Sequence, residues 1–217
     1  MQNPLDKEVW EFLKDLAAHN SKDWLDEHRE RYHAQKEKVV QFTAAVYDHL
    51  ATVESLPYLD PKKSVSRINN NRKFHPSKPP YKTHFGVMIK RGENRCEFYI
   101  HLEPEGCFLG AGMYHPPRDI LDAIRDQIHH TGNELAQIVE NPAFRQMYGD
   151  LQGESLKTAP RDFPKNHPQI DLIRRKDFVV MRNLPEKAML DKNAFGKISE
   201  AYRAALPFMQ FIDKALK

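Results

Sequence analysis

The chain has 217 residues, 40% hydrophobic and 29% charged, so it is long enough for one large or two small domains with a buried core. This composition excludes global disorder, and no apolar run approaches the roughly 20 residues that a membrane helix requires. The first residues lack the features of a signal peptide, so we expect a soluble cytoplasmic protein without a membrane partner. Cys96 and Cys107 are too few for a disulfide framework and are predicted to be reduced core residues.

The net charge of +3 conceals an uneven distribution. Residues 62–91, which we call the basic stretch, contain nine Lys or Arg and no Asp or Glu. The rest of the chain carries the other 24 basic residues against 30 acidic ones. The basic stretch is therefore a local positive region that attracts anions, on a chain that is otherwise acidic.

The first 55 residues are predicted to be helical. Val9, Phe12, Leu13 and Leu16 recur at helical spacing, and Asn20-Ser21 interrupts that helix with capping side chains. A second helical segment begins there, and a third carries a stripe of apolar residues at Val39, Phe42, Val46 and Leu50.

The middle of the chain changes to strand patterns. Residues 64–68 predict a short strand, and a connection rich in Pro and Asn follows up to Pro80. Two runs alternate with period two on either side of a turn at residues 92–94, which predicts an antiparallel hairpin over residues 85–102. A third strand is expected over residues 107–113, where Gly110 and Gly112 permit close packing rather than form a dinucleotide fingerprint.

The second half returns to helices. Pro116-Pro117 opens a helical region that extends to about Tyr148, residues 152–175 are expected to be irregular, and residues 178–181 predict a strand. A final helix is expected over residues 193–217. The pattern favours an α+β fold in which N- and C-terminal helices pack around a central antiparallel β-meander, as a single domain over residues 1–217.

The basic stretch is the first candidate site. Arginine presents a planar fork of donors that matches carboxylate or phosphate, lysine adds a point charge, and prolines stiffen the segment that carries them. Phe74 and Tyr81 provide a stacking surface or anchor the loop. The alternative is a solvated loop. The candidate ligand-binding residues are Arg67, Arg72, Lys73, Lys78, Tyr81 and Lys82.

The polar face of the hairpin is the second candidate. Tyr99, His101 and Glu103 alternate, so they are predicted to project from one side of the strand. A His and a carboxylate on one face act as a general base with its orienting partner, or as two metal ligands. His84 ends the loop part of the basic stretch, begins the neighbouring strand and is expected near this face, so the candidate catalytic residues are His101, Glu103 and His84. The alternative is an ordinary solvent-facing strand.

The 11 histidines raise the question of a metal site. The candidate ligands are His75, His84, His101, Glu103 and His115, but none has the His-Glu-x-x-His or paired Cys-x-x-Cys spacing of strong metal motifs. The sequence therefore predicts no metal site and leaves the cofactor unknown.

Several segments together resemble the uncharacterised family called domain of unknown function 2461. The main one runs from Arg67-Ile68 through Phe74 to Lys78-Pro-Pro-Tyr-Lys-Thr-His84. The others are residues 102–104 with 108–114 and 116–117, residues 156–161 with 167–168, and the helical residues Asn20, Trp24, His28 and Tyr32. The resemblance implies a one-domain architecture and no particular reaction.

The basic stretch departs from the family pattern at Asn70-Asn71, Lys73 and Ser77, where Arg-Asp, Arg and Asp are expected. Either a functional Asp is lost here, or the loop only binds and Asn suffices.

Two functions follow as expectations. The first is a protein that binds a small anionic ligand, for example a phosphate-bearing one, or an enzyme that acts on such a ligand. Arg67, Arg72, Lys78 and Lys82 would surround the ligand, and His101 with Glu103, or His84, would provide acid–base chemistry. The second is a non-catalytic module that binds nucleic acid or an acidic protein, which the low net charge disfavours for nucleic acid. The first predicts Arg67, Lys82, His101 and Glu103 around one site.

Overall fold

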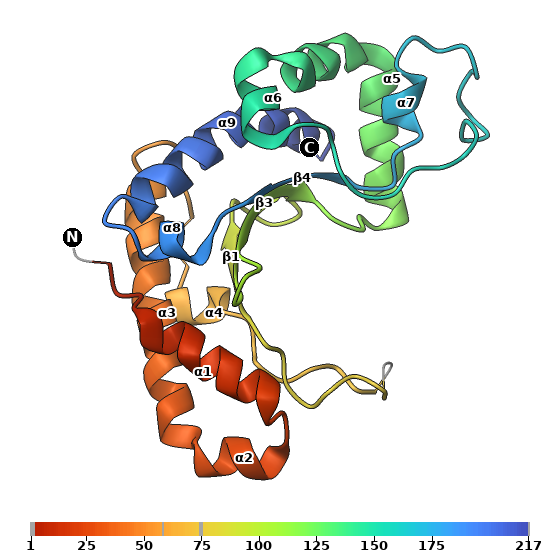
Figure 1. Ribbon diagram of the computed structural model, residues 1–217. Helices are drawn as coiled ribbons and strands as arrows, with labels where there is room; N and C mark the ends of the chain where they lie inside the picture. The colour runs from red at the N-terminus through yellow and green to blue at the C-terminus, as the bar shows by residue number, and fades with distance from the viewer. Residues whose placement is uncertain (1–2, 58, 74–75, 217) are drawn as a thin grey trace. The chain divides into compact units, whose positions relative to one another are not determined.

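A computed structural model of the chain describes residues 3–57, 59–73 and 76–216. It contains a four-stranded antiparallel sheet in the order β1-β2-β3-β4 (Figure 1). The strands are β1 (Phe85–Lys90), β2 (Glu97–Leu102), β3 (Phe108–Met113) and β4 (Phe178–Asn183). Helices precede and follow these strands along the chain, so the predicted α+β class with a meander and helices at both termini is confirmed.

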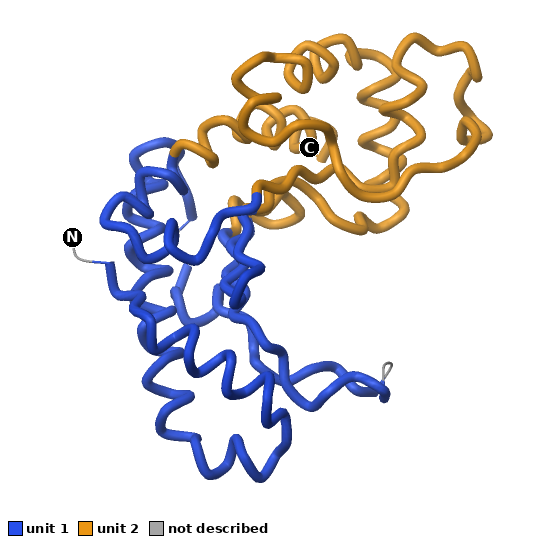
Figure 2. The backbone as a smooth tube through the Cα atoms, in the orientation of Figure 1, with its two compact units in different colours: residues 1–89, 99–109, 183–199 blue, residues 90–98, 110–182, 200–217 orange. Residues whose placement is uncertain are grey.

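The backbone divides into two compact units (Figure 2). Unit 1 consists of residues 1–89, 99–109 and 183–199, and unit 2 of residues 90–98, 110–182 and 200–217. The prediction that the whole chain folds as one domain stays a prediction. Both candidate sites, apart from the last two residues of the basic stretch, belong to unit 1.

Unit 1 begins with helices whose ends the sequence specifies. The Asp6 side chain accepts the Glu8 N–H at the start of α1 (Lys7–Ala18), and Ser21 accepts the Trp24 N–H at the start of α2 (Lys22–Glu27). The other helices here are α3 (Arg29–Leu50), α4 (Pro61–Ser64) and α8 (Glu186–Leu190).

The core of unit 1 joins these helices to the sheet. The ring of Phe12 lies 6.5 Å from the ring of Phe85 and 6.1 Å from that of Tyr32, and the Tyr32 ring stacks on Phe85 at 6.4 Å. Phe12 and Phe85 are fully buried, so α1 and α3 pack on the first residue of β1. This packing fixes the position of the residue just before Phe85, which is His84.

Unit 2 contains α5 (Arg118–Glu140), α6 (Pro142–Tyr148), α7 (Ile170–Ile173) and residues 200–214 of α9 (Ala194–Lys214). Helix α5 has a non-helical residue at Thr131, and Asn141 caps α6. The predicted role of Gly112 in close packing is confirmed, because a Cβ there would lie 2.0 Å from the Phe178 carbonyl oxygen.

Two local predictions are wrong, and one helix was not predicted. Residues 64–68 form no strand: Asp60 caps the helical turn α4, whose last residue is Ser64, and Val65 then makes one isolated bridge to Val87. Helix α7 lies in the segment expected to be irregular, and α8 was not predicted. The first error has a physical cause, because proline at the first position of a capped turn favours helix over strand.

Cys96 and Cys107 are both buried free thiols, as predicted. No helix among the described residues combines the length and apolar character that crossing a bilayer would require.

Candidate functional site

Three polar side chains of the hairpin form a hydrogen-bonded chain along one face of β2. The hydroxyl of Tyr99 lies 2.9 Å from Nδ1 of His101, and Nε2 of His101 lies 3.0 Å from Oε2 of Glu103. The prediction that these residues share a face is therefore confirmed. His101 is buried, whereas the Glu103 side chain at the strand end is 34% exposed, so the chain leads from the interior to solvent.

The surroundings of Tyr99 and Glu103 determine the protonation of this hydrogen-bonded chain. Burial opposes ionisation of Glu103, but hydrogen bonds from Thr83 and His101 outweigh it and lower the pKa of Glu103. Burial, with a smaller contribution from Glu103, raises the pKa of Tyr99 to about 12, so this hydroxyl keeps its proton at neutral pH. A carboxylate only accepts hydrogen bonds, so Nε2 of His101 carries the proton between them.

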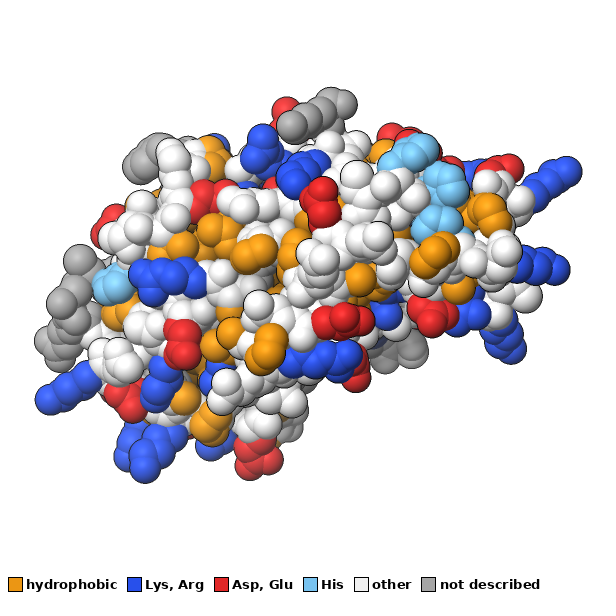
Figure 3. Space-filling view, turned by 90° about the horizontal axis from the view of Figure 1, so that it is seen from above, with side chains coloured by type: hydrophobic (Ala, Val, Ile, Leu, Met, Phe, Trp, Pro, Cys, Tyr) orange, Lys and Arg blue, Asp and Glu red, His pale blue; other side chains and the backbone are white. Residues whose placement is uncertain are grey.

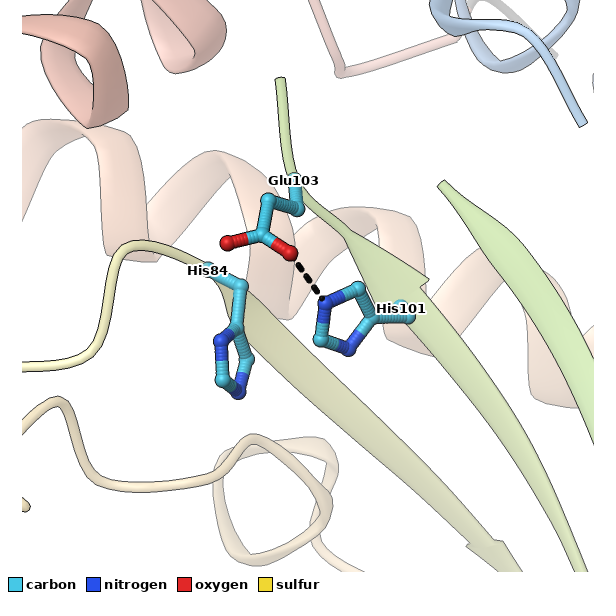
Figure 4. Close-up of side chains that lie close together, drawn as sticks. All are labelled: His84, His101 and Glu103. Carbon is cyan, nitrogen blue, oxygen red and sulfur yellow. Dashed lines mark hydrogen bonds and ion pairs between the residues drawn. The ribbon is translucent and has the colours of Figure 1, made fainter. Parts of the chain in front are cut away.

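His84, the residue of the basic stretch directly before β1, lies beside this hydrogen-bonded chain. Its ring lies 4.2 Å from the ring of His101, and the two imidazoles lie side by side below the Glu103 carboxylate in Figure 4. Burial first, then the neighbouring His101 and Lys82, lower the pKa of His84 to about 4. His84 is therefore a neutral imidazole with a lone pair at physiological pH.

Lys82 and Arg67 place two cations beside this cluster. The Lys82 ammonium donates to the Arg67 carbonyl at 3.0 Å, and the backbone N–H of Lys82 donates to Ile68. Burial first, then the Arg67 guanidinium, lower the pKa of Lys82. The Lys82 charge also acts on His84. Arg67 is thus connected to Lys82, and Lys82 to His84, which lies beside His101 and Glu103. That Arg67, Lys82, His101 and Glu103 surround one ligand stays a prediction.

The other candidate cations of the basic stretch lie in the segment between Asn69 and Tyr81, two residues that form an isolated bridge. Arg72, Lys73 and Lys78 are exposed on this segment, which runs out and returns beside itself (Figure 1). Tyr81 is only 7% exposed. The structure therefore places Tyr81 as an anchor rather than as a stacking surface for a ligand.

Asn20 fastens this anchor from the turn between α1 and α2. Its side-chain amide donates to the Tyr81 carbonyl at 2.9 Å and accepts the Tyr81 N–H at 3.0 Å. Two hydrogen bonds therefore hold the basic stretch at Tyr81 to the helices of unit 1.

The two asparagines that depart from the family pattern make local contacts. The Asn70 side chain donates to the Pro79 carbonyl at 3.0 Å, and its N–H donates to Pro80. The Asn71 side chain accepts the Lys73 N–H. Asn70 thus fastens the outgoing and returning halves of the stretch to each other, a role that requires no carboxylate.

The remaining candidates do not join the cluster. Phe74 and His75 lie outside the described residues. His115 belongs to unit 2, where its Nδ1 lies 3.1 Å from the buried Asp177 carboxylate, which also accepts the His115 and Glu154 N–H groups. Asp177 thereby connects two loops of unit 2, and the contact of His115 with Asp177 belongs to this structural connection.

Sequence reasoning missed three residues that shape the cluster. Thr83 donates to Oε1 of Glu103 at 2.7 Å, and the Phe108 ring stacks on His101 at 4.5 Å. Gly86 leaves room for Tyr99, because a Cβ there would lie 2.5 Å from the Tyr99 hydroxyl. Thr83 could have been identified because it directly precedes the candidate His84. Gly86 could have been identified because a glycine inside a strand indicates close packing.

Chemically, the cluster offers two imidazoles, one carboxylate and a neighbouring ammonium group. Among the described residues, His84, His101 and Glu103 each offer one ligand atom, and these atoms all lie within 4.8 Å of one another. Such an arrangement transfers protons or holds a metal ion.

Comparison with known proteins gives one result. A family model described as "Conserved hypothetical protein (DUF2461)" matches residues 8–211. No curated protein and no solved structure matches the chain. The matched range covers nearly all of the 217 residues and includes the whole cluster, and the chain therefore belongs to the DUF2461 family.

Proposed function

We propose that the protein binds a small anionic ligand in unit 1, at the cluster formed by Arg67, Lys82, His84, His101 and Glu103. One observation carries the proposal. Lys82 and His84 of the basic stretch lie next to the polar face of β2, so a cation and a histidine come together with the His101–Glu103 pair.

The two cations support an anionic ligand. The Arg67 guanidinium lies close enough to lower the pKa of Lys82, and no carboxylate among the described residues raises that pKa. Two like charges beside each other without a counter-charge repel, and a bound anion relieves this repulsion. Lys82 is half-buried, which strengthens its attraction for a charge that displaces water.

A small ligand fits the charge distribution better than a polymer does. On the face of the molecule in Figure 3, Lys and Arg side chains are interspersed with Asp and Glu side chains rather than gathered in one patch. The chain outside the basic stretch carries more acidic than basic residues. A nucleic acid, whose binding requires contacts to many phosphates, would be repelled by the acidic residues of such a surface.

Thermal unfolding with added anions tests this proposal. We expect inorganic phosphate, a nucleotide or citrate to raise the melting temperature of the full chain. Lys82→Ala should abolish the rise and Arg67→Ala should reduce it. Lys63→Ala, which removes an exposed lysine of the same basic stretch in α4, should retain it.

Two outcomes would reject the proposal. One is that none of these anions shifts the melting temperature or binds by calorimetry. The other is that only single- or double-stranded nucleic acid binds, with an affinity that falls steeply with salt and that depends on Arg72, Lys73 and Lys78 together. That result would favour the nucleic-acid module.

A further inference from the structure

We infer that His84, His101 and Glu103 hold one divalent first-row transition-metal ion, with zinc as its representative. Each residue contributes one ligand atom, and the three atoms come from only two adjacent places: the residue before β1 and the end of β2. Figure 4 shows the two rings and the carboxylate facing one common region.

The donor set determines the class of metal. Imidazole nitrogens suit zinc, iron, cobalt, nickel and copper, whereas magnesium and calcium prefer oxygen ligands throughout. Two imidazoles with one carboxylate are a set that catalytic zinc and non-haem iron sites share. Three protein ligands leave at least one coordination position open, which distinguishes this arrangement from the closed four-ligand sites that only stabilise a fold.

The separation between two of the ligand atoms already suits a metal. Two ligands about 2.1 Å from one ion, at tetrahedral or octahedral angles, lie about 3.0–3.4 Å apart. The Nε2 atom of His101 and the Oε2 atom of Glu103 are 3.0 Å apart. The metal takes the place of the proton that now lies between these atoms, and His101 then carries its proton on Nδ1.

Outer-shell contacts hold both of these ligands in the required orientation. The oxygen of Tyr99, 2.9 Å from Nδ1 of His101, accepts the proton that the metal-bound tautomer carries there. Thr83 donates to Oε1 of Glu103 at 2.7 Å and leaves Oε2 for the ion. Phe108 stacks on the His101 ring at 4.5 Å and limits its rotation. Metal-ligating histidines and carboxylates have partners of this kind in proteins.

His84 supplies the third ligand. It is the residue directly before β1, and its half-buried ring lies 4.2 Å from the ring of His101. The structure records a ring contact between His84 and His101 but no hydrogen bond from the His84 ring to another described residue. A ring rotation can therefore bring its nitrogen from the present separation, within 4.8 Å, to the ion.

A metal ion also explains why a carboxylate lies inside an anion site, and this part of the inference rests on the proposed function. Without the ion, the negative charge of Glu103 would repel an anionic ligand at this cluster. A divalent ion makes the cluster strongly positive and offers open coordination positions to anionic oxygens. The ligand class is then an anion with a phosphate or carboxylate group that binds the ion directly and contacts Lys82.

Calorimetric titration of zinc chloride into the EDTA-treated, dialysed full chain tests the metal site. We expect one zinc ion per chain. His84→Ala, His101→Ala and Glu103→Gln should each weaken binding by more than the about 10- to 100-fold that an outer-shell change costs. His130→Ala and Glu105→Gln, which change an exposed histidine and an exposed glutamate of the neighbouring turn, should leave zinc binding unchanged.

Circular dichroism and thermal melting of each metal-free variant show whether it folds, so that a lost ligand is distinguished from a lost fold. If buried His101→Ala fails to fold, half-buried His84→Ala and partly exposed Glu103→Gln decide the matter. Unchanged zinc binding in all of the folded ligand variants would overturn the inference. Loss of zinc binding in His130→Ala would also overturn it.

A second titration, of inorganic phosphate into the metal-free and the zinc-loaded protein, separates the two proposals. Stronger phosphate binding to the zinc-loaded form supports both. Zinc binding without phosphate binding leaves the metal site standing and rejects the proposed function. Equal phosphate binding with and without zinc supports the proposed function and rejects the metal as its basis.

Discussion

The imidazole of His101 lies between the hydroxyl of Tyr99, 2.9 Å from Nδ1, and the carboxylate of Glu103, 3.0 Å from Nε2. The relationship of His101 with Tyr99 gives the first prediction. Tyr99→Phe removes the group that orients the ring and should weaken zinc binding about 10- to 100-fold, because outer-shell partners contribute that much. The loss of one hydrogen bond should lower the free energy of unfolding by only about 1–3 kcal/mol. Zinc calorimetry and urea unfolding measure the two effects; unchanged zinc affinity would show that Tyr99 does not position His101.

A substitution at Gly86 provides a second test of the role of the Tyr99 hydroxyl. Gly86→Ala introduces a Cβ that would lie 2.5 Å from the Tyr99 oxygen, so the Tyr99 side chain must shift away from His101. We expect weaker zinc binding without any change to a ligand. In the Tyr99→Phe background the same substitution should have a much smaller effect, because the contact with His101 is already lost. Additive effects of the two substitutions on zinc affinity would contradict this account.

Asn20 connects the helices to the site across 61 residues of sequence. Asn20→Asp retains the acceptor for the Tyr81 N–H but cannot donate to the Tyr81 carbonyl, and Asn20→Ala loses both bonds. We expect both variants to weaken phosphate and zinc binding, because Lys82 and His84 lie within three residues after Tyr81. The effect of Asn20→Ala should be the larger. Faster amide hydrogen exchange of residues 81–84 should accompany the loss, and protected amides with normal binding would refute the anchoring role.

Unit 2 contains a buried ion pair between Arg91 and Asp213. The Arg91 guanidinium contacts the Asp213 carboxylate, whose other oxygen accepts the Cys96 N–H at 2.7 Å, and both side chains are nearly inaccessible. Asp213→Ala should lower the free energy of unfolding by about 3–5 kcal/mol, because it removes the charge opposite a buried guanidinium. Asp150→Ala removes the partner of exposed Arg145 and should cost less than about 1 kcal/mol. Urea unfolding of both variants checks this, and equal costs would contradict it.

The two thiols should be unreactive in the folded protein. Burial first, and then the Asp213 charge, raise the pKa of Cys96 well above its usual value, and burial raises the pKa of Cys107. A raised pKa keeps the thiol protonated at pH 8, and the thiolate is the reactive form. We expect neither cysteine to react with Ellman's reagent until denaturant is added, when two thiols per chain should appear. Rapid reaction of the native protein would show that the thiols are exposed.

The site was predictable from sequence only where short-range periodicity determines geometry. The period-two alternation of β2 predicts that Tyr99, His101 and Glu103 share a face, since successive residues of a strand point to opposite sides. The position of His84 follows because the hairpin places the start of β1 opposite the end of β2. The sheet and the terminal helices are predictable for the same reason.

The remaining features depend on contacts between distant residues. No local pattern indicates that Asn20 binds Tyr81, or that Gly86 makes room for Tyr99. The apolar residues Val65 and Ile68 suggested a strand, but a capped turn and single bridges take its place. The absence of a metal-binding spacing in the sequence led to the prediction of no metal, because the three proposed ligands belong to two chain segments that meet only in the folded protein.

Anomalous diffraction at the zinc absorption edge, on crystals of the full chain grown with zinc, tests the central claim most directly. The account predicts a peak about 2.1 Å from a nitrogen of His84, Nε2 of His101 and a carboxylate oxygen of Glu103, and a phosphate added to the crystal should bind beside it, in contact with Lys82. A peak at other histidines with none at this cluster would contradict the account.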